Sequence, residues 1–260
     1  IDNQDNIYIV YNASRKNILN EIFKKIVKNF NLIEDRCLIA IQGPDSYESI
    51  SSILNPSNDM KFLDIEILQH QSSNLLISRS GYTGEDGFEI SILNRDAEDL
   101  VKQILKNTNT NLCGLGCRDS LRVEAGLSLY GNEINEDITP IQAELSWALD
   151  KNRLNDKKLN CSKVLSEQLN VAKTIKKIGL TPVNKTMLRN NMTLHNSEQT
   201  EIGYITSGCY SPILKKSIGI GYINQISKIS DTIFVKVRGN FEEIKLVKIP
   251  FVKKNYKKGD

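Results

Sequence analysis

The sequence has 260 residues, of which 40% are hydrophobic and 25% are charged, and its formal net charge is +3. This composition is typical of a folded globular protein of about two domains. It contains no apolar run near the ~20 residues of a membrane-spanning helix, and no basic cluster large enough for a nucleic-acid-binding surface. We therefore expect neither a membrane nor a nucleic acid as a partner.

The N-terminal region is expected to alternate strands and helices. The β-branched and aromatic run at residues 7–11 predicts a strand, and residues 37–41, stopped by Gly43 and Pro44, predict a buried one. Between them, Asn12 and Ser14 are candidate helix caps. An amphipathic helix follows, because apolar residues recur at helical spacing at Ile18, Leu19, Ile22, Phe23, Ile26, Val27 and Phe30.

The pattern continues through the middle of the chain. A short helix through Ile50 and Leu54 precedes a strand at residues 75–77. A turn punctuated by three glycines, at residues 81–87, leads into residues 88–92, which alternate with period two. Further helices are predicted at residues 96–105, from about 118 to 127, and at 164–169.

The character of the chain changes after residue 150. Residues 151–160 are polar and predict an exposed connection. Beyond them, five strand-like runs at residues 175–180, 202–206, 218–223, 233–237 and 244–249 predict an all-β barrel or sandwich. The fold class is therefore α+β, with one domain at residues 1–150 and a second at residues 172–254.

Glu89 is the first candidate functional residue. On an alternating strand, Phe88 and Ile90 point to one face and Glu89 to the other, so Glu89 either faces solvent or lines a site. The preceding glycines let the backbone approach a ligand closely. A buried carboxylate there favours a partner with two adjacent N–H donors, such as a guanidinium or a pterin ring.

Arg118 is the second candidate. It lies at the start of its predicted helix, where the helix dipole disfavours a cation, which indicates a bound anion or a specific contact. The glycines at 114 and 116 lack the remaining features of a dinucleotide or phosphate loop. For Arg122 and Glu124 we expect an ordinary salt-bridged helix face.

The C-terminal tail and the cysteines give weaker indications of a functional site. Lys253, Lys254, Lys257 and Lys258 form the one basic cluster, which is either a solvated end or a surface that attracts an anionic ligand or an acidic partner. Five scattered cysteines include no C-x-x-C pair, and there are two histidines. We therefore predict no metal site.

These motifs, in their order, resemble the aminomethyltransferases, the T-proteins of the glycine cleavage system. The resemblance covers essentially the whole chain. It rests on residues 5–13, residues 38–44 (Leu-Ile-Ala-Ile-Gln-Gly-Pro), residues 80–90 (Ser-Gly-Tyr-Thr-Gly-Glu-Asp-Gly-Phe-Glu-Ile), residues 117–127 (Cys-Arg-Asp-Ser-Leu-Arg-Val-Glu-Ala-Gly-Leu), and residues 129–134, 206–212 and 250–256.

The resemblance implies a fold and a reaction. Three compact lobes would surround a central cavity, the last of them the β domain. Lipoylated H-protein would present an aminomethyl group, whose methylene carbon is attacked by the N5 nitrogen of tetrahydrofolate, the co-substrate, with release of ammonia. By family pattern Glu89 would hold the donor edge of the pterin, and Asn12, Arg118 and Tyr256 would also contact the folate.

The family's catalytic residue has no counterpart in this sequence. In the family, a Gly-Gly-x-x-Asp-Asp motif precedes the Asn-Ala strand, and its second Asp is the catalytic acid. By spacing, that Asp falls upstream of Ile1, and Asp2 and Asp5 are too close to Asn12 to replace it. With Ile rather than Met at position 1, we expect a processed or cropped chain that lacks about 100 residues and is inactive by itself.

Two alternatives stay open at this stage. Dimethylglycine and sarcosine dehydrogenases end in a similar folate-binding module, and this chain carries no flavin fingerprint of its own. Folate-dependent iron–sulfur assembly proteins share the scaffold without being enzymes, although Gly208, Cys209 and Tyr210 stand in a T-protein context. The resemblance fits a bacterial cytoplasm and a mitochondrial matrix equally.

Overall fold

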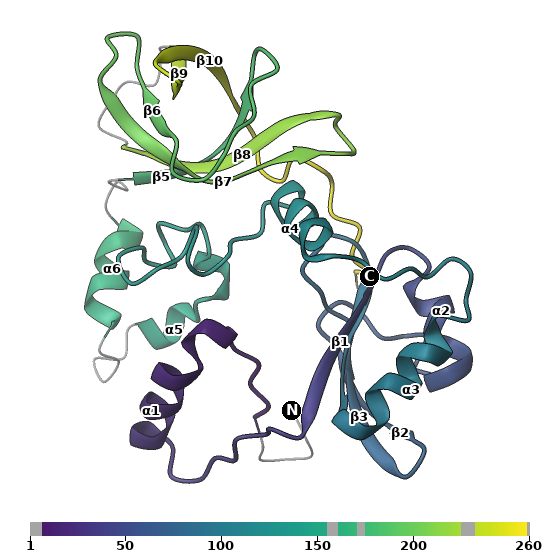
Figure 1. Ribbon diagram of the computed structural model, residues 1–260. Helices are drawn as coiled ribbons and strands as arrows, with labels where there is room; N and C mark the ends of the chain where they lie inside the picture. Colours follow the sequence, from purple (N-terminus) through teal and green to yellow (C-terminus); the bar gives the residue numbers. More distant parts are fainter. Residues whose placement is uncertain (1–6, 155–160, 171–174, 225–231, 259–260) are drawn as a thin grey trace. The chain divides into compact units, whose positions relative to one another are not determined.

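The computed structural model describes residues 7–154, 161–170, 175–224 and 232–258 (Figure 1). The chain divides into two compact units, each of which is described by itself. The first unit comprises Ile1–Gly81, Glu85–Cys113 and Asn255–Asp260, and the second comprises Tyr82–Gly84 and Gly114–Lys254.

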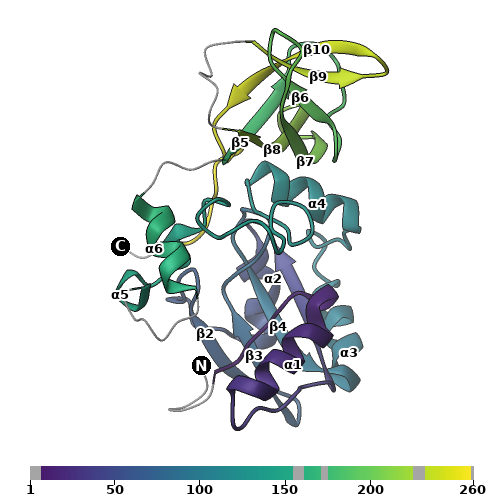
Figure 2. The ribbon, with the colours of Figure 1, turned by 90° about the vertical axis from the view of Figure 1, so that its left-hand side faces the viewer.

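A four-stranded antiparallel sheet forms the centre of the first unit, in the order β1-β4-β3-β2. Helices α2 and α3 cover one of its faces, and α1 lies on the side of the opposite face (Figures 1 and 2). The elements are β1 Arg36–Gln42, α2 Ser46–Leu54, β2 Ile65–His70, β3 Ser73–Ser78, β4 Gly87–Leu93 and α3 Asn94–Ile104.

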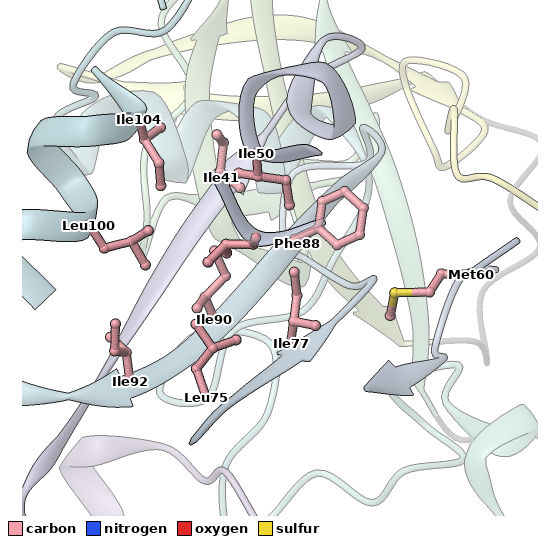
Figure 3. Close-up of a cluster of buried hydrophobic side chains, with 11 residues drawn as sticks. Ile41, Ile50, Met60, Leu75, Ile77, Phe88, Ile90, Ile92, Leu100 and Ile104 are labelled. Atoms are coloured by element: carbon pink, nitrogen blue, oxygen red, sulfur yellow. The ribbon is translucent and has the colours of Figure 1, made fainter. Parts of the chain in front are cut away.

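The core of this unit lies between the sheet and the two covering helices. Phe88, Ile90 and Ile92 of β4 are completely buried, as the predicted alternation required. They pack against Ile50 of α2 and Leu100 of α3 (Figure 3). The opposite face of the sheet is more open, because Leu38, Ile65 and Ile67 remain 41–45% exposed there. Glu89 belongs to this open face.

The segment before β1 differs from the prediction. Residues 7–11 form no strand, because β-propensity needs a ladder partner and none is found for them among the described residues. The 3-10 helix η1 Ala13–Arg15 and the helix α1 Lys16–Ile26 follow. The apolar stripe is therefore helical as predicted, although α1 ends before Phe30. Its side chains Ile18, Ile22 and Ile26 stay 43–69% exposed.

The second unit begins with helices. The predicted helix near Arg118 is α4 Leu115–Glu124, and the amphipathic stripe near residue 165 is α6 Ser162–Asn170. The polar stretch after residue 150 is not wholly irregular, since α5 Lys151–Leu154 begins it and Leu154 is buried with Leu165. The rest of that stretch, residues 155–160, lies outside the described residues.

Six strands of the second unit close into a barrel, in the order β10-β5-β8-β7-β6-β9 (Figure 2). The predicted α+β class is thus confirmed, and the β part is a barrel rather than a sandwich. Each of the five predicted strands is present, and β6 adds a sixth. The strands are β5 Ile175–Pro182, β6 Thr193–His195, β7 Glu201–Ser211, β8 Lys216–Asn224, β9 Ile233–Val237 and β10 Asn240–Val247.

Among the described residues, no helix combines the length and the apolar character needed to cross a membrane.

Candidate functional site

Glu89 stands in the middle of the open sheet face. Its cross-strand neighbours are Ala40 on β1 and Ser78 on β3. Both neighbours are small, so the carboxylate is half-buried rather than covered. Alternation placed Glu89 on this face and left open whether it faces solvent or a site, and the intermediate burial shows that the side chain is partly shielded from water.

One oxygen of the Glu89 carboxylate is held by the protein. Ser80 Oγ donates a hydrogen bond of 2.9 Å to Glu89 Oε2, and Ser78 Oγ donates one of 2.9 Å to Ser80 Oγ. No hydrogen bond to Glu89 Oε1 is found in the described part of the chain. The fixed carboxylate therefore keeps acceptor capacity at Oε1.

The loop that leads into Glu89 is anchored by an ion pair that the sequence reasoning missed. Arg79, only 4% exposed, donates from Nε to Asp86 Oδ1 at 3.0 Å and from Nη2 to Asp86 Oδ2. Its guanidinium also lies 5.0 Å from the ring centroid of Phe88. Burial by itself raises the pKa of Asp86, but the hydrogen bonds and the charge of Arg79 outweigh it, so the pKa of Asp86 is lowered.

Asn12 lies at the start of the 3-10 helix η1. As predicted, it caps a helix, because its Oδ1 accepts hydrogen bonds from Ser14 N at 3.0 Å and from Ser14 Oγ at 2.6 Å. The segment before it crosses the open face, since Tyr8 OH lies 2.8 Å from Ser91 Oγ, and Ser91 is the next residue after Glu89 to face that way. The Asn12 side chain is exposed.

Arg118 makes a specific contact within the second unit. It lies in the first turn of α4, and its guanidinium stands 5.1 Å from the ring centroid of Tyr82. Tyr82 OH donates to the carbonyl of Ser128 at 2.5 Å, and burial raises the pKa of Tyr82 to about 12. An aromatic face thus offsets the unfavourable position of the cation at the helix start.

Tyr256 is partly buried, while Lys253 and Lys258 of the basic cluster are exposed, so the tail is packed only in part. The Tyr256 ring stacks on Phe62 at a centroid distance of 4.0 Å and an angle of 8°. Phe62 N donates to Lys257 O at 2.8 Å, and Asn255 Nδ2 donates to the Glu85 carboxylate at 3.1 and 3.2 Å. The pKa of Tyr256 is raised, chiefly by burial and also by the charge of Glu85.

Arg122 and Glu124 are not an ordinary solvated face, and that expectation was wrong. Arg122 is 1% exposed and pairs with the fully buried Glu133 at 2.8 Å. Glu124 is 2% exposed and accepts a hydrogen bond from Ser211 Oγ of the barrel strand β7. Both side chains thus turn inward, and they tie α4 to neighbouring parts of the second unit.

Family models match both halves of the chain. The "GCVT N-terminal domain" matches residues 2–153, and the "Glycine cleavage T-protein C-terminal barrel domain" matches residues 176–253. The chain belongs to the glycine cleavage T-protein family. A solved T-protein, the glycine cleavage system aminomethyltransferase T from Bartonella henselae, superposes with a TM-score of 0.86 at 32% identity, covering 95% of this chain and 69% of that one.

Aminomethyltransferases from distant organisms show the same similarity. The mitochondrial aminomethyltransferase of Flaveria trinervia is 35% identical over 98% of this chain, and the aminomethyltransferase of Prochlorococcus marinus is also 35% identical over 98% of this chain. The chain spans 65% of the length of the Flaveria T-protein and 71% of that of Prochlorococcus.

The candidate residues of this T-protein family member fall into both units. Asn12, Glu89 and Tyr256 belong to the first unit, and Arg118 belongs to the second. In the part of the chain that the structure describes, no group of three or more His, Cys, Asp or Glu side chains could hold a metal ion.

Proposed function

We propose that this protein takes part in tetrahydrofolate-dependent aminomethyl transfer in the glycine cleavage system. In that reaction the methylene carbon of an aminomethyl group, carried on the lipoyl arm of H-protein, passes to tetrahydrofolate and ammonia is released. The chain spans 65% of the length of the Flaveria relatives. The activity of those longer proteins is therefore proposed for this chain. The named relatives are aminomethyltransferases, which favours this reading over a dehydrogenase module or an iron–sulfur assembly protein.

The carboxylate of Glu89 is the observation that carries this proposal. Its Oε2 is fixed by Ser80, its Oε1 has no protein donor among the described residues, and its cross-strand neighbours are small. These features fit a planar ligand that offers two adjacent N–H donors, as the pterin ring of tetrahydrofolate does. The chain's part in catalysis is then to bind and orient the folate, while the reactive nitrogen belongs to the folate itself.

Asn12, Arg118 and Tyr256 are proposed as further folate contacts. The Asn12 amide and the Arg118 guanidinium are both exposed, so they are accessible to a ligand. The stack on Phe62 orients Tyr256, and a fixed aromatic ring suits contact with a flat ligand. The proposed limits of the folate-binding and barrel domains, residues 1–150 and 172–254, and the arrangement of lobes around a cavity stay predictions.

H-protein with its lipoyl arm is the proposed protein partner. The relatives are mitochondrial and bacterial, so the reaction would take place in the mitochondrial matrix or in a bacterial cytoplasm.

Replacing Glu89 is expected to abolish most of the affinity for tetrahydrofolate. The Glu89→Ala variant should bind roughly 100-fold more weakly, because each hydrogen bond to a charged group contributes about 1.5–3 kcal/mol. Calorimetric titration measures this difference. The matched control is Glu66→Ala, which removes another half-buried glutamate of the same sheet and should leave affinity unchanged. Equal binding by Glu89→Ala and the unsubstituted chain would remove Glu89 as the pterin anchor.

The 260-residue chain by itself is expected to form no methylenetetrahydrofolate. Its sequence offers no counterpart of the family's catalytic Asp, so aminomethylated H-protein and tetrahydrofolate should not turn over, even where folate binds. The assay follows the product with the 260-residue chain and, as a positive control, with the Prochlorococcus aminomethyltransferase. Appreciable turnover by the chain contradicts the expectation and would direct attention to acidic residues within it.

A further inference from the structure

Gln42, the last residue of β1, fastens the start of the loop that precedes Glu89. Its Nε2 lies 3.1 Å from Ile41 O, 3.0 Å from Ser80 O and 3.4 Å from Phe88 O. The amide has two protons for these three carbonyls, so the bonds are shared. A single side chain thus joins the end of β1, the start of the loop and the beginning of β4.

Two glycines make room for this amide. A Cβ built at Gly81 would overlap the Gln42 side-chain amide, and one built at Gly87 would stand 2.5 Å from Ile41 O and 2.6 Å from Gln42 Nε2. Neither glycine has a positive φ. A side chain at position 81 would therefore force the Gln42 amide out of its present place and away from its hydrogen bonds, whereas backbone conformation does not require glycine there.

Ser80 is hydrogen-bonded both to Gln42 and to Glu89, and so links the two side chains. Its carbonyl is held by Gln42, and its hydroxyl donates to Glu89 Oε2 at 2.9 Å. Because a serine hydroxyl has one proton, the Ser80 oxygen is left to accept, and it accepts from Ser78 Oγ at 2.9 Å. The hydrogen bonds thus run in one direction, from Ser78 through Ser80 to the carboxylate.

We propose that Ser80 is a positioning residue for Glu89, and that Gln42 fixes the position of Ser80. The relay fixes the plane of the carboxylate so that Oε1 and a remaining lone pair of Oε2 face two adjacent N–H donors of a ligand. This inference rests on the proposed function and extends it to specificity. Ser80 would determine how strongly the site distinguishes a ligand with the full donor pair from one that lacks half of it.

The role of Gln42 in holding the loop before Glu89 is tested first, without any ligand. Gly81→Ala should lower the melting temperature by roughly 3–10 °C, and adding Gln42→Ala should restore part of that loss, because the overlapping amide is gone. Gly87→Ala is the matched control. Its Cβ also meets the backbone carbonyl of Ile41, so Gln42→Ala should not rescue it. If Gly81→Ala lowers the melting temperature equally with and without Gln42→Ala, the proposed role of Gln42 in holding the loop is overturned.

The positioning role is tested by ligand discrimination. The unsubstituted chain should bind tetrahydrofolate more tightly than an analogue without the 2-amino group, and Ser80→Ala should reduce that ratio about tenfold. Ser80→Thr, which keeps the hydroxyl, should preserve the ratio. The control is Ser73→Ala, because Ser73 Oγ, at the start of β3, makes a comparable 2.6 Å bond to the Asp96 carboxylate. A general structural loss would weaken both ligands equally and leave the ratio intact.

The outcomes distinguish a failure of the proposed function from a failure of the positioning role of Ser80. If the unsubstituted chain binds neither ligand, the proposed function fails and the role of Ser80 fails with it, while the melting experiment still decides whether Gln42 clamps the loop. If the unsubstituted chain discriminates and Ser80→Ala discriminates equally well, the positioning role is overturned and the proposed function stands.

Discussion

Replacing Glu133 with alanine is expected to destabilise the second unit by about 3–5 kcal/mol, because the substitution removes the fully buried carboxylate that pairs with the buried charge of Arg122. Arg122 and Glu133 are 1% and 0% exposed and lie 2.8 Å apart. A surface pair would contribute about 1 kcal/mol or less. Burial is therefore what makes the loss large. The guanidinium would keep the 46% exposed carboxylate of Asp119, 2.8 Å from its Nε, but its buried Nη1 side would lose its carboxylate and could not be rehydrated without opening the structure.

The Arg122–Glu133 pair also organises its surroundings. Arg122 Nη2 donates to Ser207 Oγ at 2.6 Å, and Thr206 Oγ1 donates to Glu133 Oε1 at 2.6 Å, so the pair joins α4 to the barrel strand β7. Tyr222 OH of β8 donates to the Glu133 carbonyl at 2.8 Å. Loss of the carboxylate should consequently increase hydrogen exchange in α4, β7 and β8, with little change in the sheet of the first unit.

Two variants control this prediction. Asp119→Asn removes a partner of Arg122 that is 46% exposed, and it should cost less than about 1 kcal/mol. The double substitution Arg122→Met with Glu133→Leu removes both charges and should recover most of the stability that Glu133→Ala loses. Urea unfolding followed by circular dichroism, with hydrogen exchange to separate the units, measures each case. A loss from Glu133→Ala no larger than that from Asp119→Asn would contradict the argument.

The local periodicity of the sequence predicted the structural features that depend on residues close together in the chain. Period two placed Glu89 opposite Phe88 and Ile90, and turn-bounded runs indicated the strands of the barrel. It could not tell a barrel from a sandwich, because closure depends on which strands pair at the ends of the order. The three-residue strand β6 is too short to show a period. The strand β2 was missed because Leu68 follows Ile67 directly and interrupts the alternation that Ile65, Glu66 and Ile67 begin.

Contacts between distant residues were not visible in the sequence. Gln42 meets Ser80 across 38 positions, and Arg122 meets Ser207 across 85. Nothing in the local pattern distinguishes Arg122 from a solvated arginine, since a helical stripe says nothing of what packs on it. The run at residues 7–11 shows the converse failure, because strong β-propensity without a pairing partner left the backbone irregular.

Replacing Asp86 with alanine is expected to destabilise the first unit by about 3–5 kcal/mol, for it strands the buried guanidinium of Arg79. That guanidinium is 4% exposed and would retain the Met60 carbonyl, 3.0 Å from Nη1, and the rings of Tyr47 and Phe88, at 5.8 and 5.0 Å, but it would lose the Asp86 carboxylate. Asp86→Asn keeps one acceptor and should lose less. Asp59→Ala, at an exposed position, is the control and should change stability by about 0.5 kcal/mol or less.

Acid should remove the contribution of Asp86 in a defined direction. The folded-state pKa of Asp86 lies below the ordinary value of 3.8, since the hydrogen bonds and charge of Arg79 exceed the opposing effect of burial. Such a group contributes stability in full above its unfolded pKa and loses it as the pH falls through the folded pKa. The difference in unfolding free energy between the unsubstituted chain and Asp86→Asn should therefore stay constant from pH 7 to about pH 5 and shrink below about pH 4. A difference that persists undiminished at pH 3, or that vanishes by pH 6, would show that the ion pair is not what holds the loop before Glu89.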